Sequence, residues 1–351
     1  MKQHLVPRPV MLAACAAAVL AAAACSSSSS SSTSSSSSTS ASTSTAAAAG
    51  ASSSAILKVA LIEPSLRNDL AFSQSMYAAV QSLAGPMNLK VSVSDNLFNL
   101  TDAGNAMRQY ASTGYNLIIA HGSQYGSIVQ QLAPQFPKTS FAWGTAGVTF
   151  GQPNVFAYQA NSQEGGYVEG YMAALMSKSK VLGVIGPIDV GDAHLYVTGF
   201  KAGALAAVPT ATVHTSFTGS FSDDTLMETA AKSYVSEHAD VLTGSSQSVV
   251  GAIGVAKQDN VAWFGTQWDQ ATLAPTQVLA CQVYDWTGIL KQMITKIRGG
   301  VLGGTTYTIT LGNGGEKIVF NPSYPVPASV KAAGTKVISE IISGSVKPPT
   351  T

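Results

Sequence analysis

The run Lys58-Val59-Ala60-Leu61-Ile62 and the segment Phe72–Ala84 that follows it set a pattern which the chain repeats. The run is short and almost wholly apolar, as in a strand buried on both faces. In Phe72–Ala84, the apolar residues Met76, Ala79, Val80 and Leu83 recur at i, i+3, i+4 and i+7, which is the spacing of a helix. A buried strand followed by such a helix predicts the first β-α unit of a parallel sheet.

The same alternation continues along the body of the chain. Strand-like runs begin near residues 58, 91, 117 and 139, and the pattern restarts at Val181–Ile185 and runs on through Val213–Phe217, Val241-Leu242 and Ala262-Trp263-Phe264. This spacing is typical of right-handed β-α-β units. The sequence therefore predicts an α/β protein with two successive sheets, and a ligand cleft where the carboxyl ends of their strands face each other.

We expect each lobe to be assembled from two separate parts of the chain. The first lobe comprises residues 55–159 and is completed by about 279–312, and the second comprises 160–278 and is completed by about 313–345. In this scheme the strand Val278–Val283 and the helix Asp285–Arg298 return to the first lobe.

The N-terminal residues have the features of an export signal. Residues 1–24 combine Lys2 and Arg8 with a short apolar run that ends in small residues, a pattern typical of a cleaved secretory signal. Cys25 follows directly, as in a bacterial lipobox, and is the predicted site of lipidation. Cys15 is the alternative, although it would leave an apolar segment of only about six residues. An ordinary secreted protein without a lipid anchor also remains open.

Residues 25–54 are rich in Ser, with Thr, Ala and a single Gly. Such a segment has too little apolar surface to offset the entropy of ordering, so it is predicted to be a flexible linker. After a lipidated cysteine, it would hold the folded body away from a membrane.

The charge of the chain excludes one class of partner. The 19 Lys and Arg against 18 Asp and Glu give a net charge of +1, and charged residues are only 11% of the chain. A protein that binds nucleic acid through its phosphates needs a basic surface, so no nucleic-acid partner is expected.

No enzyme signature is visible in the sequence. The chain lacks a phosphate-binding loop of the Gly-x-x-x-x-Gly-Lys type, a Gly-x-Ser-x-Gly elbow and a His-Glu-x-x-His motif, and its five histidines do not have metal-ligand spacing. We therefore expect no catalysis, no metal and no cofactor. Cys281 lies in an apolar run and is predicted to be a buried structural thiol.

The polar loop after the first strand is the first candidate site. Asp69 has two interpretations there: it caps the following helix, or it accepts hydrogen bonds from a ligand. Phe72 is likewise either a core residue or a ring face for a ligand. The residues alone leave both alternatives open.

Several strings in this order resemble one known family. They are Asp69-Leu70-Ala71-Phe72-Ser73-Gln74, Phe136-Pro137 with Phe141-Ala142, Glu164-Gly165-Gly166-Tyr167, Gly186-Pro187-Ile188-Asp189, Gly219-Ser220-Phe221-Ser222-Asp223 and Gly265-Thr266-Gln267-Trp268-Asp269. They are similar to elements of the basic-membrane-protein (BMP, PnrA-like) family, lipoproteins that bind substrates for ABC importers of purine nucleosides. The resemblance implies a type I periplasmic-binding-protein fold, two Rossmann-like lobes joined by a hinge.

The resemblance also implies roles for single residues. Phe72 would stack on the base, Asp69 and Ser73 would hold its polar edges, and Asp269 would accept from a ribose hydroxyl or a ring N–H. The chain departs from the family where Trp143-Gly144-Thr145 replaces an Asp and where Tyr284 replaces a Lys. We therefore expect Trp143 and Trp268 near the ligand, with His121 either touching it or lying behind it.

The resulting prediction is a substrate-binding lipoprotein of an ABC importer. It would be a monomer in the cell envelope that binds a purine nucleoside or nucleobase between its lobes and presents a closed surface to a membrane permease. A sugar-binding protein of the same fold and a signalling or structural lipoprotein remain the alternatives.

Overall fold

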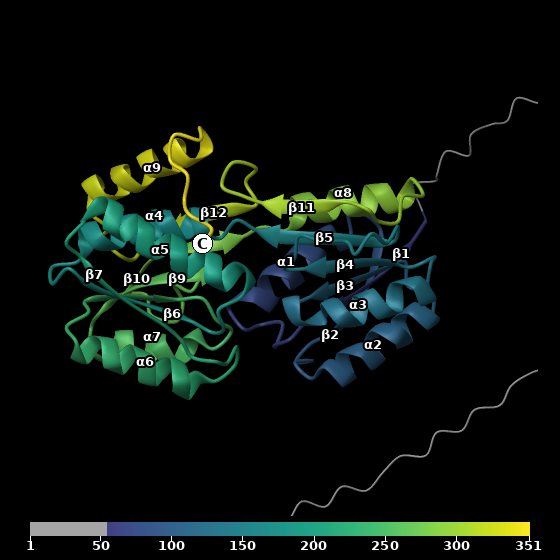
Figure 1. Cartoon of the computed structure of the whole chain (residues 1–351), viewed down its shortest axis with the longest axis horizontal. Helices are drawn as coiled ribbons and strands as arrows, with labels where there is room; N and C mark the ends of the chain where they lie inside the picture. Colours follow the sequence, from purple (N-terminus) through teal and green to yellow (C-terminus); the bar gives the residue numbers. More distant parts are fainter. Residues whose placement is uncertain (1–54) are drawn as a thin grey trace, which may run out of the picture. The chain divides into compact units, whose positions relative to one another are not determined.

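The computed structural model describes residues 55–351, and two six-stranded sheets form the centre of this part of the chain (Figure 1). The strand order is β11-β5-β4-β3-β1-β2 in the first sheet and β12-β10-β9-β8-β6-β7 in the second. The predicted signal, linker and Cys25 lie outside the described residues. All pairings within the first sheet are parallel, and in the second only β10 and β12 pair antiparallel.

The first sheet is built mostly from the N-terminal half of the body. Its strands are β1 (Leu57–Ile62), β2 (Leu89–Ser94), β3 (Leu117–His121), β4 (Ser140–Gly144), β5 (Val155–Ala160) and β11 (Thr306–Ile309). The helices that accompany it are α1 (Phe72–Ala84), α2 (Leu100–Ser112), α3 (Gly126–Leu132) and α8 (Thr287–Arg298), with two short 3-10 turns at Ser123–Tyr125 and Ala133–Gln135.

The second sheet follows after one crossing of the chain. Its strands are β6 (Val181–Gly186), β7 (Thr212–Phe217), β8 (Val241–Gly244), β9 (Ala262–Gln267), β10 (Val278–Tyr284) and β12 (Glu316–Phe320). Its helices are α4 (Gln163–Met176), α5 (Gly191–Ala207), α6 (Asp224–Ser236), α7 (Val249–Gln258) and α9 (Ala328–Ile342). None of the helices in residues 55–351 is both long and apolar enough to cross a membrane.

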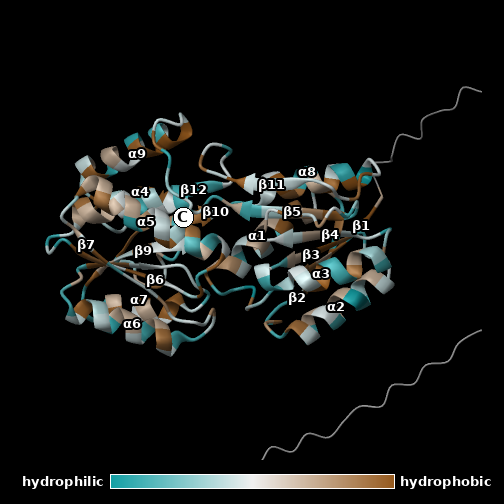
Figure 2. Ribbon diagram, viewed as in Figure 1, coloured by the Kyte–Doolittle hydropathy of each residue, from teal (hydrophilic) through white to brown (hydrophobic). Residues whose placement is uncertain are grey.

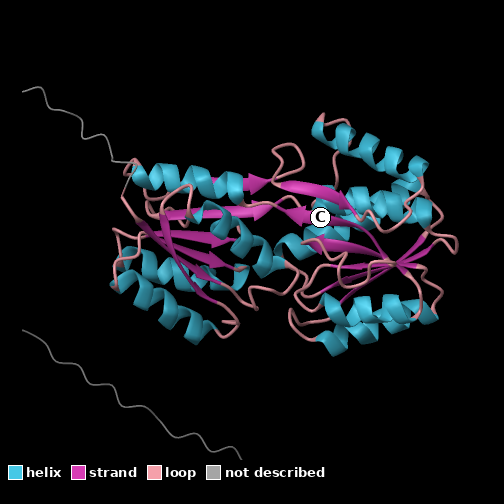
Figure 3. Ribbon diagram, turned by 180° about the vertical axis from the view of Figure 1, so that it is seen from behind, coloured by secondary structure: helices cyan, strands magenta, loops and turns pink. Residues whose placement is uncertain are grey.

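Each sheet is covered by helices on both faces (Figure 3). In β1, Val59 and Leu61 pack with α1 and α8, whereas Ala60 and Ile62 pack with α2 and α3. The second sheet is enclosed in the same way, with α4, α5 and α9 on one face and α6 and α7 on the other. Figure 2 shows the resulting distribution, with apolar residues along the strands and polar residues on the outer sides of the helices. Strands buried on both faces explain the nearly continuous apolar runs of the sequence.

The strand at 278–284 corrects one sequence-based expectation. We expected it to return to the first lobe, but β10 pairs with β9 and β12 and so belongs to the second sheet. The helix that follows it, α8, packs on the first sheet as expected, together with α1. The chain therefore changes sheets after β10 rather than before it.

Helices α4 and α5 pack unusually closely because glycines face each other across their contact. A Cβ atom at Gly170 would collide with the backbone carbonyl of Phe200, and one at Gly203 would collide with that of Tyr167. Both contacts are with backbone, which has little freedom to move aside. The close packing fixes α5, whose first turn reaches the site described below.

We predict that Gly170→Ala lowers the free energy of unfolding by about 1–3 kcal/mol, because the added methyl group overpacks this contact. Gly254→Ala is the matched control, since it also lies within a helix but has no atom within 4 Å of a Cβ position. The control should be neutral or slightly stabilising, as expected for Gly→Ala in an open helix. Urea denaturation of both variants measures the difference, and equal stability would contradict the packing argument.

Candidate functional site

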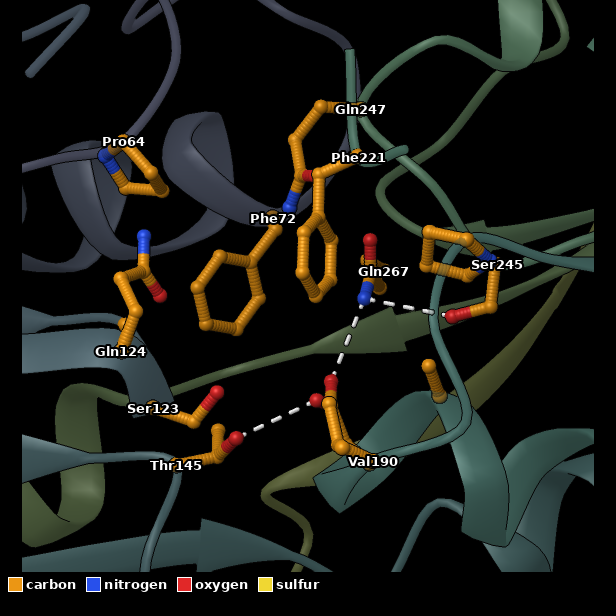
Figure 4. A pocket seen from close by; sticks show the side chains of 14 residues that line it. Pro64, Phe72, Ser123, Gln124, Thr145, Val190, Phe221, Ser245, Gln247 and Gln267 are labelled. Atoms are coloured by element: carbon orange, nitrogen blue, oxygen red, sulfur yellow. Dashed lines mark hydrogen bonds between the residues drawn. The ribbon is translucent and has the colours of Figure 1, made fainter. Parts of the chain in front are cut away.

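A pocket lies where the loops after the strands of both sheets meet (Figure 4). The residues that line it are Pro64, Phe72, Gly122, Ser123, Gln124 and Thr145 from the first lobe and Pro187, Val190, Asp192, Ala193, Phe221, Ser245, Gln247 and Gln267 from the second. The free cavity is only about 20 Å³, which is room for about one water molecule. The pocket is thus nearly filled by its own side chains.

Phe72 forms the wall of the pocket on the first lobe, and His121 supports it from behind. The two rings stack with centroids 3.8 Å apart and an angle of 10° between their planes. His121 Nε2 lies 3.1 Å from the carbonyl oxygen of Phe72, and Nδ1 lies 2.8 Å from the hydroxyl of Tyr158. Complete burial lowers the pKa of His121 to about 3, so the imidazole is neutral. Since a carbonyl only accepts, Nε2 donates to Phe72 and Nδ1 accepts from Tyr158.

Asp69 organises the loop that leads into α1. Its carboxylate accepts hydrogen bonds from the backbone N–H groups of Ala71, Ser73 and Gln74 at 2.9–3.1 Å and from the hydroxyl of Ser65 at 2.6 Å. The fully buried hydroxyl of Ser73 lies 2.6 Å from that same Ser65 hydroxyl. These contacts use the carboxylate within its own loop, where it fixes the start of α1 and therefore the position of Phe72.

Asp192 lines the pocket from the first turn of α5. Its Oδ1 accepts from the hydroxyl of Thr145 at 3.2 Å, and its Oδ2 accepts from Gln267 Nε2 at 3.2 Å and from the hydroxyl of Tyr284 at 3.3 Å. The Thr145 contact joins the two lobes. Burial raises the pKa of Asp192, whereas the hydrogen bonds from Thr145 and Gln267 oppose that shift. The residues that line the pocket include no lysine, arginine or histidine.

Phe221 borders the pocket on the side of the second lobe. It follows β7, and Figure 4 shows its ring beside that of Phe72 in the same cavity. Its ring also contacts that of Phe98 from the first lobe, with centroids 6.2 Å apart. The hydroxyl of Ser246 donates to the carbonyl of Phe221 at 3.0 Å and helps to fix this loop.

Unpaired polar atoms surround the cavity. Within residues 55–351, the side-chain oxygens of Gln247 and Gln267 are buried without a hydrogen-bond partner, although Gln267 Nε2 is bonded to Asp192. Both carboxyl oxygens of Glu63, the residue before the pocket residue Pro64, are also unpaired. Burial, with the nearby Asp69 and Asp95, raises the pKa of Glu63 to about 9. Glu63 is thus a neutral carboxylic acid at pH 7, able to donate as well as accept.

The structure brings only part of the sequence-predicted set to this pocket. Phe72 lines it, while Asp69, Ser73 and His121 lie behind Phe72. Trp143 stacks on Phe150 with centroids 4.7 Å apart and donates to the carbonyl of Gly122. Trp268 is half-buried outside the lining, and the exposed Asp269 accepts from the backbone N–H of Ala271 at 2.9 Å. Asp269 therefore caps its own turn and lies outside the pocket lining, whereas the resemblance implied that it would accept from the ligand.

Several pocket residues were not singled out from the sequence. Phe221 and Gln267 stood inside strings that resembled the family, and their place at the carboxyl end of a strand or in the loop after it was the available signal. Gln267 has a φ of 67°, and its side chain lines the cavity whereas that of Asp269 does not. Asp192 had no such signal, because an acidic residue in the first turn of a helix is common for electrostatic reasons alone.

The described residues offer no metal site. No three His, Cys, Asp or Glu side chains within residues 55–351 gather in a way that would hold a metal ion. Cys281 is buried as predicted, and burial raises the pKa of its thiol.

A comparison with protein families matches residues 56–347 to the family described as ABC transporter substrate-binding protein, PnrA-like. A purine-binding protein of Brucella abortus is 28% identical over 66% of this chain, and the match spans only 65% of that protein's length. The transcriptional activator protein Med of Bacillus subtilis is 26% identical over 74% of this chain and 80% of its own. The nucleoside-binding protein BmpA of Lactococcus lactis is 26% identical over 84% of this chain and 89% of its own.

Solved structures share the fold. The solute-binding protein of an ABC transporter system from Conexibacter woesei aligns with a TM-score of 0.70 over 84% of this chain and 98% of its own, at 23% identity. At this identity the likeness concerns the fold alone, and it confirms the bilobed α/β architecture expected from the sequence.

We predict that Glu63→Gln removes a pH dependence of stability. The pKa of Glu63 is about 9 in the folded protein and near 4.5 when unfolded, so the unfolded state loses this proton first as the pH rises. Between those values the wild type should lose about 1.4 kcal/mol of unfolding free energy per pH unit relative to the variant. Denaturation at pH 5.5 and 8.5 measures this difference. Glu228→Gln on the surface is the control, and parallel curves for wild type and Glu63→Gln would contradict the prediction.

Proposed function

Because the chain belongs to the PnrA-like family of ABC transporter substrate-binding proteins, we propose that it captures a purine nucleoside or a free purine base in the pocket between its lobes. The observation that carries this proposal is the pair Phe72 and Phe221, one from each lobe, whose side chains border the same cavity. The names of two relatives, a purine-binding and a nucleoside-binding protein, agree with it.

The aromatic pair suits a flat heterocycle. Stacking a base on an aromatic side chain contributes roughly 1–3 kcal/mol, and a ring held between two such faces gains on both sides. Phe72 is prepared for this role, since its stacked contact with His121 and its hydrogen-bonded carbonyl hold it in place. The loop fixed by Asp69 adds to this support.

The polar groups around the cavity would set the orientation of the ligand. Asp192 and the amide groups of Gln247 and Gln267 come from the second lobe, and Ser123 and Gln124 come from the first. A mostly apolar pocket with a few directional polar groups is the usual composition of a small-molecule site. The absence of lysine and arginine from the lining disfavours phosphorylated ligands.

Ligand entry requires the lobes to separate. The cavity of about 20 Å³ is far below the roughly 300 Å³ or more of a typical ligand pocket. The contacts that close it include two hydrogen bonds, Thr145 with Asp192 and Gln270 Nε2 with the carbonyl of Leu70, both at 3.2 Å, and the ring contact of Phe98 with Phe221. We propose that the ligand takes the place of these contacts on binding, and that the closed protein then delivers it, chemically unchanged, to a membrane permease.

Substrate-binding proteins of ABC importers act on the outer side of the cytoplasmic membrane. We propose that this chain is a monomer held there by a lipid on Cys25, with residues 26–54 as its tether.

For the ligand, we expect calorimetry to detect binding of at least one purine among adenine, guanine, hypoxanthine, xanthine and their nucleosides. Phe72→Ala and Phe221→Ala should each weaken that binding about tenfold or more, because each removes one stacking face. Phe320→Ala, on the edge strand β12 and outside the pocket lining, should not change it. A heat of binding with glucose, galactose or ribose but with no purine would favour the sugar-binding alternative. No heat of binding with any of these ligands would contradict a purine carrier.

For the anchor, we expect palmitate labelling of the protein expressed in a bacterial host to depend on Cys25. Cys25→Ser should abolish the label and release the protein from membranes. Cys15→Ser should keep both the label and the attachment to membranes. Mass spectrometry of the mature N-terminus identifies the modified residue. An unlipidated N-terminus in the wild type would contradict the anchor without affecting the ligand proposal.

A further inference from the structure

We propose that Asp192 determines which purines the pocket accepts, by selecting a base whose edge carries two adjacent N–H donors, as in guanine and guanosine. This inference rests on the proposed purine site and makes it more specific. Its starting point is that, within the described residues 55–351, Asp192 is the one carboxylate among the residues that line the pocket.

The carboxylate of Asp192 has neutral partners. Its three recorded hydrogen bonds come from a hydroxyl, an amide and a phenol, those of Thr145, Gln267 and Tyr284. With an ionised carboxylate all three groups donate to it; burial raises the pKa of Asp192, and these hydrogen bonds oppose that shift. Since the lining residues carry no basic side chain, no cation of the protein competes with a ligand donor for this carboxylate.

The hydrogen bonds of Asp192 also leave room for a ligand. Their lengths of 3.2–3.3 Å lie at the long end of the hydrogen-bond range and exceed what a charged acceptor usually makes. A carboxylate has about four acceptor positions, and three are used here by long contacts. A donor from the ligand can therefore add to these contacts or replace the longest of them.

The neighbouring atoms favour the same kind of ligand. The side-chain oxygens of Gln247 and Gln267 border the same cavity and are unpaired acceptors within residues 55–351. The second-lobe wall of the pocket therefore presents unpaired acceptors beside Asp192, with Nε2 of Gln247 as the donor on the same amide. A ligand edge rich in N–H groups would satisfy them, whereas an edge of carbonyl oxygens would leave them unpaired and add repulsion.

Among purines, the two-donor edge belongs to guanine. Its N1–H and its 2-amino group point the same way and fit the two oxygens of a carboxylate in a bidentate contact. Hypoxanthine lacks the amino group and keeps one donor, xanthine has a carbonyl in its place, and adenine presents an unprotonated N1 as an acceptor. The expected order is therefore guanine first, hypoxanthine next, and xanthine and adenine last.

The experiment compares bases that differ by the amino group alone. Calorimetry on the full mature protein measures guanine against hypoxanthine, and guanosine against inosine, in wild type, Asp192→Asn and Asp192→Ser. We expect the wild type to prefer the amino-bearing member by about tenfold or more, the usual value of a hydrogen bond to a charged group. Both variants should reduce that preference to about twofold or less. Thermal unfolding of each variant establishes that it is folded.

Asp189→Asn is the matched control. Asp189 is an exposed carboxylate in the same loop, paired with His194 rather than with the pocket, and its removal should leave the preference unchanged. Equal binding of guanine and hypoxanthine by the wild type would overturn the inference, as would a preference that persists in both Asp192 variants. In both cases a purine still binds, so the proposed function survives. Only the lack of binding by any purine or nucleoside would overturn both.

Discussion

The structure depends on one constraint, which is that the loops following the carboxyl ends of two sets of parallel strands meet at one place. In each sheet the strands that are paired in parallel point the same way, so the residues that follow them gather at one edge. Ser123 and Thr145 follow β3 and β4 in the first sheet, while Pro187 and Ser245 follow β6 and β8 in the second. The pocket arises from this arrangement before any particular side chain is considered.

The side chains at that edge are held by buried contacts outside the cavity. Phe72 depends on the neutral ring of His121, which is itself hydrogen-bonded to the buried Tyr158 of β5. On the other side, Asp192 depends on α5, which the glycine contacts with α4 hold close. The pocket-lining groups therefore lie on elements that are packed tightly within each lobe. Motion is left to the contacts between the lobes, such as the hydrogen bond of Thr145 with Asp192 and the ring contact of Phe98 with Phe221.

The sequence predicted the fold well because hydrophobic periodicity is a local property. Buried runs such as Lys58–Ile62 and Val181–Ile185 identify strands without knowledge of their neighbours. The strand at 278–284 shows the limit of such prediction, because its apolar pattern identifies a strand but does not reveal which sheet the strand joins. That choice depends on pairing with β9 and β12, and β12 follows only after α8 and β11 have passed through the first lobe.

The site was predicted less completely, for a related reason. Asp69 drew attention as an acidic residue in a polar loop and Asp269 through the family resemblance, yet both satisfy backbone N–H groups close to them in the chain. Acidic residues in such loops are so often used locally that their type says little about a ligand. Phe72 was singled out through the family resemblance, since the residues alone left it open between a core position and a ring face for a ligand. Gln267 and Asp192 can be recognised as pocket residues only in the folded structure, where elements distant in the sequence bring them together.

The body of the chain has few charged residues, and this affects how the polar groups of the pocket are satisfied. A binding site with several carboxylates and a lysine can satisfy most polar ligands by rearranging ion pairs. Here Asp192 receives only neutral donors, and the amide oxygens of Gln247 and Gln267 receive none within residues 55–351. Buried acceptors without donors are costly, so the polar groups of the pocket are poorly satisfied although its apolar surfaces are in contact. On the proposal made above, a ligand that brings N–H groups relieves that cost, and this relief is what favours a donor-rich base.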